Sequence, residues 1–317
     1  MSEVVSTPVL HAEDARVAID DVVAIDHVTL RARGDRILCT GEAEPLFAAL
    51  TAVPLRARGG PFFNDDRFDD DRPGQAYVVA GSLLVAGRDV ATNAHLAVSG
   101  VAPLDPPLPS GMTAHEYVTW SARLAGVRTS VASGLAASAL ERVGLGPMLR
   151  RSVGGLEIPG RRALMFAHAI VADPAVLIAE SPLAGLEGAA AGFVLNALFR
   201  ASEGRGVILS SERMDPGTPE GDALSRAASD IFVFAGGALV LDAAPEALFS
   251  GVRVYAVTIR KNGNAFRDEL VQRGLTVKGG PLRMSVTLPE SATTKEIVAA
   301  ASRARAPLVE MFPIVGS

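Results

Sequence analysis

The chain has 317 residues, 49% of them hydrophobic, which is enough for one large domain and one small one. Its formal net charge of −5 gives no basic footprint for nucleic acid. No apolar run approaches the roughly 18 residues of a membrane helix, and the acidic start is unlike a secretory signal. We therefore expect a cytoplasmic globular protein without a membrane span of its own.

Cysteine and lysine are scarce, and both shortages have chemical consequences. The single cysteine, Cys39, excludes an internal disulfide and lies in an apolar run, so we expect a buried core thiol. The five histidines have no metal-ligand spacing, and we expect no metal site. The lysines are Lys261, Lys278 and Lys295, so the first 260 residues contain none.

The first part of the chain predicts short strands, one helix and a surface loop. We expect strands at residues 16–19, 22–30, 36–40 and 77–86, and a helix at residues 45–52. Residues 56–75 are rich in Gly, Pro and Asp. Their aspartates, at positions 65, 66, 69, 70 and 71, could bind a hard cation, but interleaved arginines and the lack of calcium-loop glycines favour a solvated loop.

Helices and strands alternate further along the chain. Thr113 and Glu116 predict a capping box for a helix that ends at residue 124. We expect helices at residues 133–143, 160–172, 186–202 and 219–228, strands at 175–179 and 206–210, and a hairpin of 231–234 with 238–241. This alternation predicts an α/β domain over residues 1–250, with a helical subdomain at about residues 105–160.

The pattern changes near residue 251. Strands are expected at residues 252–259, 282–288 and 308–312, and helices at 265–273 and 293–304. Residues 251–317 therefore predict a small C-terminal α+β domain, which is feasible if it docks on the larger one.

Several short motifs, in order, resemble the nucleotide-binding domain of an ABC transporter, which implies a P-loop NTPase-like fold. GDRILCTG at residues 34–41 resembles the approach to the phosphate loop, and LDPPLPSGMT at 104–113 the Q-loop. LEIPG at 156–160 resembles the signature, and VLIAESPLAGLE at 176–187 the Walker B strand with its D-loop. The tail resembles the small domain found on the ATPases of exporters whose permease is a separate polypeptide.

The same resemblance implies a phosphate loop that has lost its working residues. Gly41 is followed by Glu42, Ala43, Glu44 and Pro45, so later glycines and the lysine that neutralises phosphate oxygens are missing. Pro45 also removes an N–H donor. We expect Glu42 and Glu44 to stabilise the positive end of the following helix in place of a triphosphate.

Further positions that contact the nucleotide in this family are replaced. They are Ile19 at the adenine-stacking aromatic, Leu104 at the Q-loop glutamine, Glu157 at the signature serine (with Gly160 retained), Glu180 at the Walker B aspartate, Ser181 at the catalytic glutamate, and Glu212 at the switch histidine. A serine without an adjacent base cannot polarise the attacking water. We therefore expect no catalytic residue and no nucleotide or metal cofactor in this chain's own site.

These substitutions lead to one main hypothesis and two alternatives. The main hypothesis is a non-hydrolysing ABC-type subunit, peripheral on the inner face of the cell membrane, that acts as scaffold or regulator by binding a permease, an intact ATPase paralogue or a second copy, and no nucleic acid. The first alternative is a divergent active ATPase that uses Glu180 for magnesium and Arg36 or Arg56 in place of lysine. The second is an interaction protein without a transporter.

Overall fold

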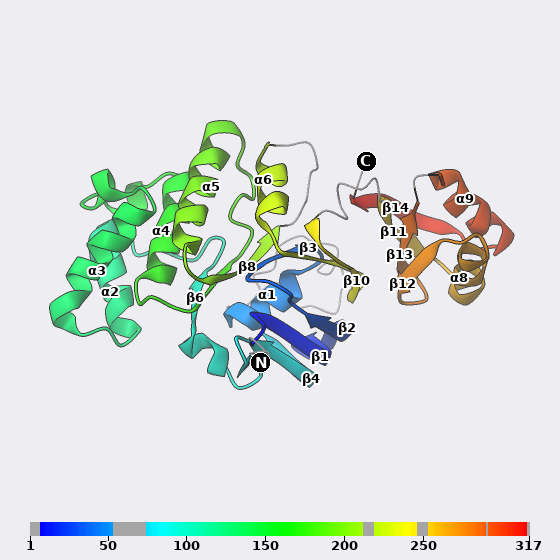
Figure 1. Ribbon diagram of the computed structural model, residues 1–317, viewed down its shortest axis with the longest axis horizontal. Coiled ribbons are helices and arrows are strands. Elements are labelled where there is room, and N and C mark those ends of the chain that lie inside the picture. The colour runs from blue at the N-terminus through cyan, green and yellow to red at the C-terminus, as the bar shows by residue number, and fades with distance from the viewer. Residues whose placement is uncertain (1–6, 53–73, 212–218, 246–252, 290, 316–317) are drawn as a thin grey trace, which may run out of the picture.

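The computed structural model describes residues 7–52, 74–211, 219–245, 253–289 and 291–315. Within these residues the chain forms three sheets (Figure 1). The first sheet has the order β2-β1-β4-β5 and consists of β1 (Leu10–Ile19), β2 (Val22–Arg31), β4 (Ala76–Val85) and β5 (Arg88–Asp89). The central sheet has the order β10-β9-β3-β8-β7-β6 and consists of β3 (Arg36–Gly41), β6 (Ser99–Ala102), β7 (Val176–Ala179), β8 (Gly206–Ser211), β9 (Asp230–Ala235) and β10 (Ala238–Ala243).

The central sheet is parallel from β9 to β6, and β10 joins it as the antiparallel partner of β9. Its strands are short and apolar because both faces are covered. Leu38 and Leu177 point into one hydrophobic core, whereas Ile37, Cys39 and Ile178 point into the other. Cys39 has no exposed surface, which confirms the predicted core thiol.

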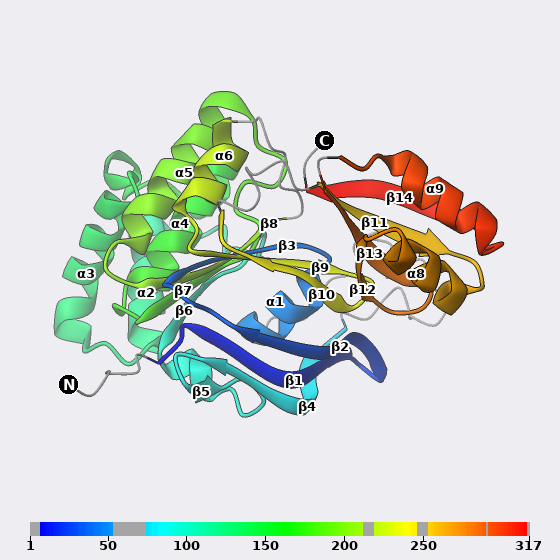
Figure 2. The ribbon, with the colours of Figure 1, turned by 45° about the vertical axis from the view of Figure 1, so that its right-hand side comes forward.

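Helices cover the two faces of the central sheet unequally. The helices of this part are α1 (Glu44–Thr51), α2 (Ala114–Leu124), α3 (Thr129–Arg142), α4 (Ile158–Ile170), α5 (Gly188–Ser202) and α6 (Pro219–Ala227). Figure 2 shows α1 between the first sheet and the central sheet, with α4, α5 and α6 on the opposite face. Helices α2 and α3 pack on each other and on α4, and form a lobe at one end of the molecule.

Helix α2 begins with the capping box that the sequence predicts. The Thr113 hydroxyl accepts the Glu116 backbone N–H at 3.2 Å, and the Glu116 carboxylate accepts the Thr113 backbone N–H at 2.8 Å. These two bonds satisfy backbone donors that have no partner within the helix. They fix the point at which the chain enters the helical lobe.

The C-terminal unit is a four-stranded antiparallel sheet with two helices on one face. It consists of β11 (Arg253–Ile259), β12 (Thr276–Gly279), β13 (Arg283–Leu288), β14 (Leu308–Val315), α8 (Gly263–Gln272) and α9 (Thr294–Arg303), in the sheet order β12-β13-β11-β14. Phe266, Leu270 and Ile297 fill the layer between helices and sheet. Val254 and Ala256 belong instead to the core of the larger part, so the sheet of this unit packs against it. The predicted domain boundary at residue 250 lies outside the described residues.

The short strands β5, β6 and β12 escaped prediction, and helix α3 begins four residues earlier than predicted. Strand β6 has the sequence SGVA and β12 has TVKG, and neither contains an apolar run or a regular alternation. Helix α3 starts at Thr129. The sequence did not indicate this start because Arg128, at the N-cap, makes no side-chain capping bond. The aspartates at positions 65–71 lie outside the described residues. Among the described helices, none has the length and hydropathy needed to cross a membrane.

Candidate functional site

The carboxyl ends of β3, β7 and β8 meet along one edge of the central sheet. Thr40 pairs with Ser211, and Ala179 pairs with Leu209, so the three strands end near one another. In open parallel α/β sheets, ligands bind at this edge. The fold therefore brings the predicted phosphate-loop and Walker B positions together, although they lie far apart in the sequence.

The backbone after β3 is bonded to strand β9 rather than open to a ligand. Gly41 has a φ of 75°, and a Cβ on it would lie 2.2 Å from the Phe234 carbonyl oxygen. The Glu42 N–H donates to that same oxygen at 2.9 Å, and the Ala43 N–H donates to the Gly41 carbonyl at 2.9 Å. Pro45, within the first turn of α1, has no N–H. The close approach of β9 thus accounts for the glycine, and two loop amides already have acceptors.

The Glu42 side chain has partners that the sequence analysis did not predict. Its carboxylate accepts the Gly236 N–H at 2.5 Å, in the turn between β9 and β10, and it makes no capping bond to α1. Its second oxygen lies 3.9 Å from the Arg283 guanidinium of the C-terminal unit. The hairpin, which is remote in sequence, therefore supplies the hydrogen-bond donor for this carboxylate, and the predicted stabilisation of the helix start by the Glu42 charge stays a prediction. Glu44 is exposed in the first turn of α1, where an acid is favourable.

Burial is the main influence on the Glu42 carboxyl. It raises the pKa of Glu42 above its ordinary value, and the Gly236 hydrogen bond and the Arg283 charge offset this only in part. Glu310 of β14 also acts to raise the pKa. The C-terminal unit therefore places one cation and one anion near the position that follows Gly41.

The Walker B positions are also engaged in internal bonds. The Glu180 carboxylate accepts the Leu104 backbone N–H at 3.1 Å, and the Leu104 side chain is buried. The Ser181 N–H donates to the Ser210 hydroxyl at 2.9 Å, and the two hydroxyl oxygens are 3.3 Å apart. Ser181 and Ser210 are both buried. Glu180 thus links the end of β7 to the segment that follows β6, and Ser181 links β7 to β8.

Ile19 lies inside the first sheet and not on an open surface. Its side chain is 2% exposed, and it packs so closely on Gly74 that a Cβ at position 74 would lie 2.7 Å from an Ile19 methyl carbon. A side chain covered in this way offers no face on which a base could stack.

The signature positions lie at the start of α4. Leu156 is buried, whereas Glu157 is exposed at the N-cap and makes no capping bond. Gly160 lies within the first turns of the helix, and Arg161 bends back to donate to the Leu156 carbonyl at 2.8 Å. The Glu157 side chain is therefore available to whatever faces this end of α4. Glu212 lies outside the described residues.

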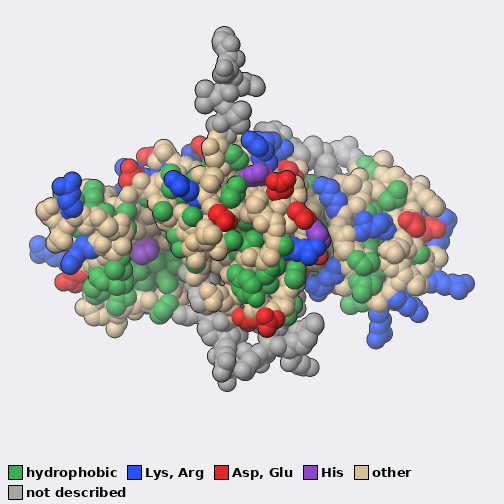
Figure 3. Space-filling view, turned by 90° about the horizontal axis from the view of Figure 1, so that it is seen from below, with side chains coloured by type: hydrophobic (Ala, Val, Ile, Leu, Met, Phe, Trp, Pro, Cys, Tyr) green, Lys and Arg blue, Asp and Glu red, His purple; other side chains and the backbone are tan. Residues whose placement is uncertain are grey.

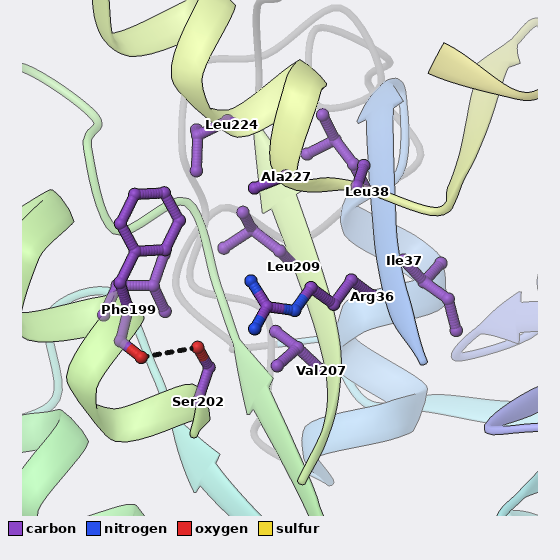
Figure 4. Close-up of a pocket in the computed structure, with 11 residues that line it drawn as sticks. Arg36, Ile37, Leu38, Phe199, Ser202, Val207, Leu209, Leu224 and Ala227 are labelled. Atoms are coloured by element: carbon purple, nitrogen blue, oxygen red, sulfur yellow. Dashed lines mark hydrogen bonds between the residues drawn. The ribbon is translucent and has the colours of Figure 1, made fainter. Parts of the chain in front are cut away.

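A small cavity lies near the amino ends of strands β3 and β8, away from this edge. It has a volume of about 30 Å³, room for about one water molecule, and is lined mainly by apolar side chains of β3, β8, α5 and α6 (Figure 4). Two residues that line the cavity lie near the starts of their strands: Arg36 is the first residue of β3, and Val207 is the second residue of β8. At about 3.3 Å per residue, Arg36 lies about 16 Å from Gly41 along the strand. We interpret this cavity as a packing gap.

No local sequence pattern points to three of the residues at this edge. Gly236, Arg283 and Ser210 contact Glu42 or Ser181 only because the chain folds distant segments together. Within the part of the chain that the structure describes, no group of three His, Cys, Asp or Glu side chains is arranged to hold a metal ion.

Comparison with known proteins shows which proteins this chain resembles in sequence and in fold. No family model matches the chain. The phospholipid-transporting ATPase ABCA7 of Homo sapiens is 33% identical over 146 residues, which make up 45% of this chain and 7% of that protein. The Nod factor export ATP-binding protein I of Azorhizobium caulinodans is 34% identical over 109 residues, 34% of either protein. The matched region thus spans about a third or less of these relatives.

Solved structures share the architecture. The ATP-binding subunit of an ABC transporter superposes with a TM-score of 0.55 at 13% identity, covering 76% of this chain and 91% of that one. The protein cbiO1 from Clostridium perfringens, part of the ABC transporter complex cbiONQ, superposes with a TM-score of 0.58 at 15% identity, covering 77% and 91%. The fold is therefore that of ABC nucleotide-binding domains of the P-loop NTPase type. The sequence matches add that up to 45% of this chain is similar in sequence to proteins of ABC transporters.

Proposed function

We propose that this chain is an ABC-transporter subunit that neither binds nor hydrolyses ATP in its own site and acts by binding other subunits. The observation that supports this most strongly is the loop after β3. A triphosphate needs free backbone N–H groups and a nearby cation. Here the Glu42 and Ala43 amides have backbone acceptors, Pro45 has no amide hydrogen, and Glu42 brings a carboxylate. These residues do not fit a Mg-triphosphate.

Electrostatics act in the same direction. Two like unit charges about 4 Å apart repel by roughly 4 kcal/mol at an effective dielectric constant near 20, before screening. A γ-phosphate at this edge would meet Glu42 and the Glu180 carboxylate, of which Glu180 already bonds to the Leu104 amide. Ser181 supplies no carboxylate base, and its hydroxyl lies against Ser210. Both binding and hydrolysis are therefore disfavoured.

The second composite site of a dimer would be weakened as well. In the family that this chain resembles, each nucleotide lies between the phosphate loop of one subunit and the signature helix of the other. A nucleotide held by a partner subunit would therefore face the start of α4. Glu157 is exposed there and its carboxylate is not engaged in capping. It would repel the partner's γ-phosphate where a serine would donate a hydrogen bond.

The alternative of a divergent active ATPase requires a cation in place of the lysine. Arg36 lies at the opposite end of β3, about 16 Å away along the strand, and cannot supply it. Arg56 lies outside the described residues. The cation that does approach Glu42 is Arg283, and it pairs with that carboxylate.

Subunit binding is the activity we propose in place of hydrolysis. The lobe of α2 and α3 carries apolar side chains with large exposed fractions: Trp120 at 45%, Leu124 at 67%, Val131 at 50% and Leu135 at 42%. Exposed apolar groups of this kind mark interaction surfaces. We propose that this lobe docks on a membrane permease, which would hold the chain at the inner face of the membrane. An intact ATPase paralogue or a second copy would complete the assembly.

Two measurements test this function. Steady-state ATP hydrolysis by the purified chain should equal that of Glu180→Gln, because neither protein turns over ATP. Co-expression with a candidate permease, followed by purification in detergent, should retain the chain, and Trp120→Ala with Leu124→Ser should reduce its recovery. Turnover that Glu180→Gln abolishes would show that the chain is an enzyme. If Trp120→Ala with Leu124→Ser leaves the recovery of the chain with the permease unchanged, the lobe is not the docking face.

A further inference from the structure

Charge is distributed unevenly between the two parts of the chain. Residues 251–317 contain ten Lys and Arg against five Asp and Glu, whereas residues 1–250 contain twenty against thirty. All three lysines belong to the C-terminal part. Figure 3 shows Lys and Arg side chains projecting around the C-terminal unit at the right-hand end of the molecule. A basic unit is thus attached to an acidic one.

Four of these cations are gathered where two loops meet. The β11–α8 loop and the α9–β14 loop are joined because the Arg260 N–H donates to the Pro307 carbonyl at 3.0 Å. The Asn262 side-chain amide also donates to the Ala304 carbonyl at 3.2 Å and to the Arg305 carbonyl at 2.9 Å. We define the basic tip as the exposed residues Arg260, Lys261, Arg303 and Arg305.

The cations of the basic tip are not used inside the protein. Within the described residues, none of the four side chains forms a hydrogen bond or an ion pair. By contrast, Arg273 of the same unit pairs with Glu296 at 2.9 Å, and Arg267 donates to the Gly279 carbonyl. The charges of the basic tip therefore remain available to an external anion.

Two exposed apolar side chains lie beside the basic tip. The Ile259 N–H donates to the Leu282 carbonyl at 2.8 Å, and Ile259 pairs with Leu308, the neighbour of Val309. Leu282 is 47% exposed and Val309 is 65% exposed. Gly263 permits this arrangement, because a Cβ there would lie 1.6 Å from the Pro281 carbonyl oxygen. Cations and apolar groups therefore share one end of the unit.

We propose that the basic tip binds the surface of a membrane that contains anionic lipids. Its cations would contact headgroup phosphates, while Leu282 and Val309 would enter the boundary with the acyl chains. The end of α9 and the start of β14 lie at the outer extremity of the molecule in Figures 1 and 2, so a flat surface can reach them.

A nucleic acid is the other polyanion with matching phosphates, and the structure favours a membrane over it. Contacts to a nucleic-acid backbone use cations and polar donors, and they give Leu282 and Val309 no role. The membrane contact rests neither on the absence of nucleotide nor on a permease, so it stands or falls separately from the proposed function.

Vesicle sedimentation of the full-length chain tests the proposal. The protein should sediment with vesicles of phosphatidylcholine and phosphatidylglycerol at low salt, and much less with phosphatidylcholine alone. Each cation near an anionic surface contributes about fivefold to binding. Arg303→Gln with Arg305→Gln should therefore weaken binding about 25-fold. Leu282→Ser with Val309→Ser should remove the part of the binding that survives added salt.

The matched control changes the same number of charges elsewhere in the same unit. Lys278 and Lys295 are exposed on β12 and α9, so Lys278→Gln with Lys295→Gln should leave vesicle binding nearly unchanged. Circular dichroism verifies that all variants fold. If Arg303→Gln with Arg305→Gln and Lys278→Gln with Lys295→Gln weaken vesicle binding equally, binding depends on net charge alone and the proposal is overturned. Indifference to phosphatidylglycerol, or binding of duplex DNA through Arg303 and Arg305 without vesicle binding, would also overturn it.

Discussion

Replacing Glu42 tests whether burial or the ion pair governs the residue that stands in the phosphate-loop position. The carboxylate accepts the Gly236 N–H at 2.5 Å and lies 3.9 Å from Arg283, whose side chain is 38% exposed. Burial is the largest influence and raises the pKa of Glu42 above 4.5. A raised pKa means that the folded protein binds this proton more tightly than the unfolded chain does. The ionised form therefore lowers the free energy of unfolding relative to the neutral form.

Two substitutions at this position should have different effects. Glu42→Gln removes the charge and keeps an oxygen for the Gly236 N–H, so we expect the free energy of unfolding at pH 7 to stay the same or rise by up to about 1 kcal/mol. Glu42→Ala also removes the acceptor, and leaving that N–H unpaired should lower the free energy by about 1–3 kcal/mol. Urea denaturation followed by circular dichroism measures both. Glu141→Ala, at an exposed site on α3 far from Glu42 in the sequence, is the control and should change it by less than about 0.5 kcal/mol.

The pH dependence gives a second check on the sign. As the pH falls from 7 through the raised pKa of Glu42 toward 4.5, the wild type should gain stability relative to Glu42→Gln, because proton uptake neutralises the buried carboxylate. A loss of more than about 1.5 kcal/mol in Glu42→Gln at pH 7 would mean that the Arg283 ion pair outweighs burial. That result would refute the reasoning.

Three further changes have defined outcomes. Asp230 is fully buried, and although burial, the largest influence, raises its pKa, hydrogen bonds from Arg33 and Gly34 hold the pKa below its ordinary value. Asp230→Asn should lower the free energy of unfolding by about 3 kcal/mol in urea denaturation, and the difference should vanish as acid protonates Asp230. Thr113→Ala should lower it by about 1 kcal/mol in the same measurement, and no change would exclude the capping box. Ser181→Glu should not yield ATP turnover in a phosphate-release assay; turnover would show that only the base was missing.

The sequence predicted the fold well where local pattern and tertiary structure agree. The apolar run of β7 became a buried strand of the parallel part of the central sheet, and the capping box at Thr113 formed with both bonds. Helical spacing in α4 and α5 gave buried faces. In these cases the residues that carry the signal also make the contacts.

Sequence analysis could not identify contacts whose partner is distant in the chain. The role of Glu42 depends on Gly236 and Arg283, about 190 and 240 positions away, and no local pattern specifies that the hairpin and the C-terminal unit meet there. Gly41 stays a predicted phosphate-loop position, and the structure adds a constraint on it that no local pattern specifies, namely the nearby Phe234 carbonyl. Strand β6 was missed because small residues such as Gly100 show no strand preference, yet its pairing with β7 places Leu104 beside Glu180.

Isothermal titration of Mg-ATP into the full-length chain tests most directly whether the edge formed by Gly41, Glu42, Glu180 and Ser181 accepts a nucleotide. We predict no saturable heat, even at millimolar nucleotide, because the Glu42 and Ala43 amides already have backbone acceptors and no lysine neutralises the phosphates. A saturable isotherm with a micromolar Kd, lost in Glu180→Gln, would contradict this.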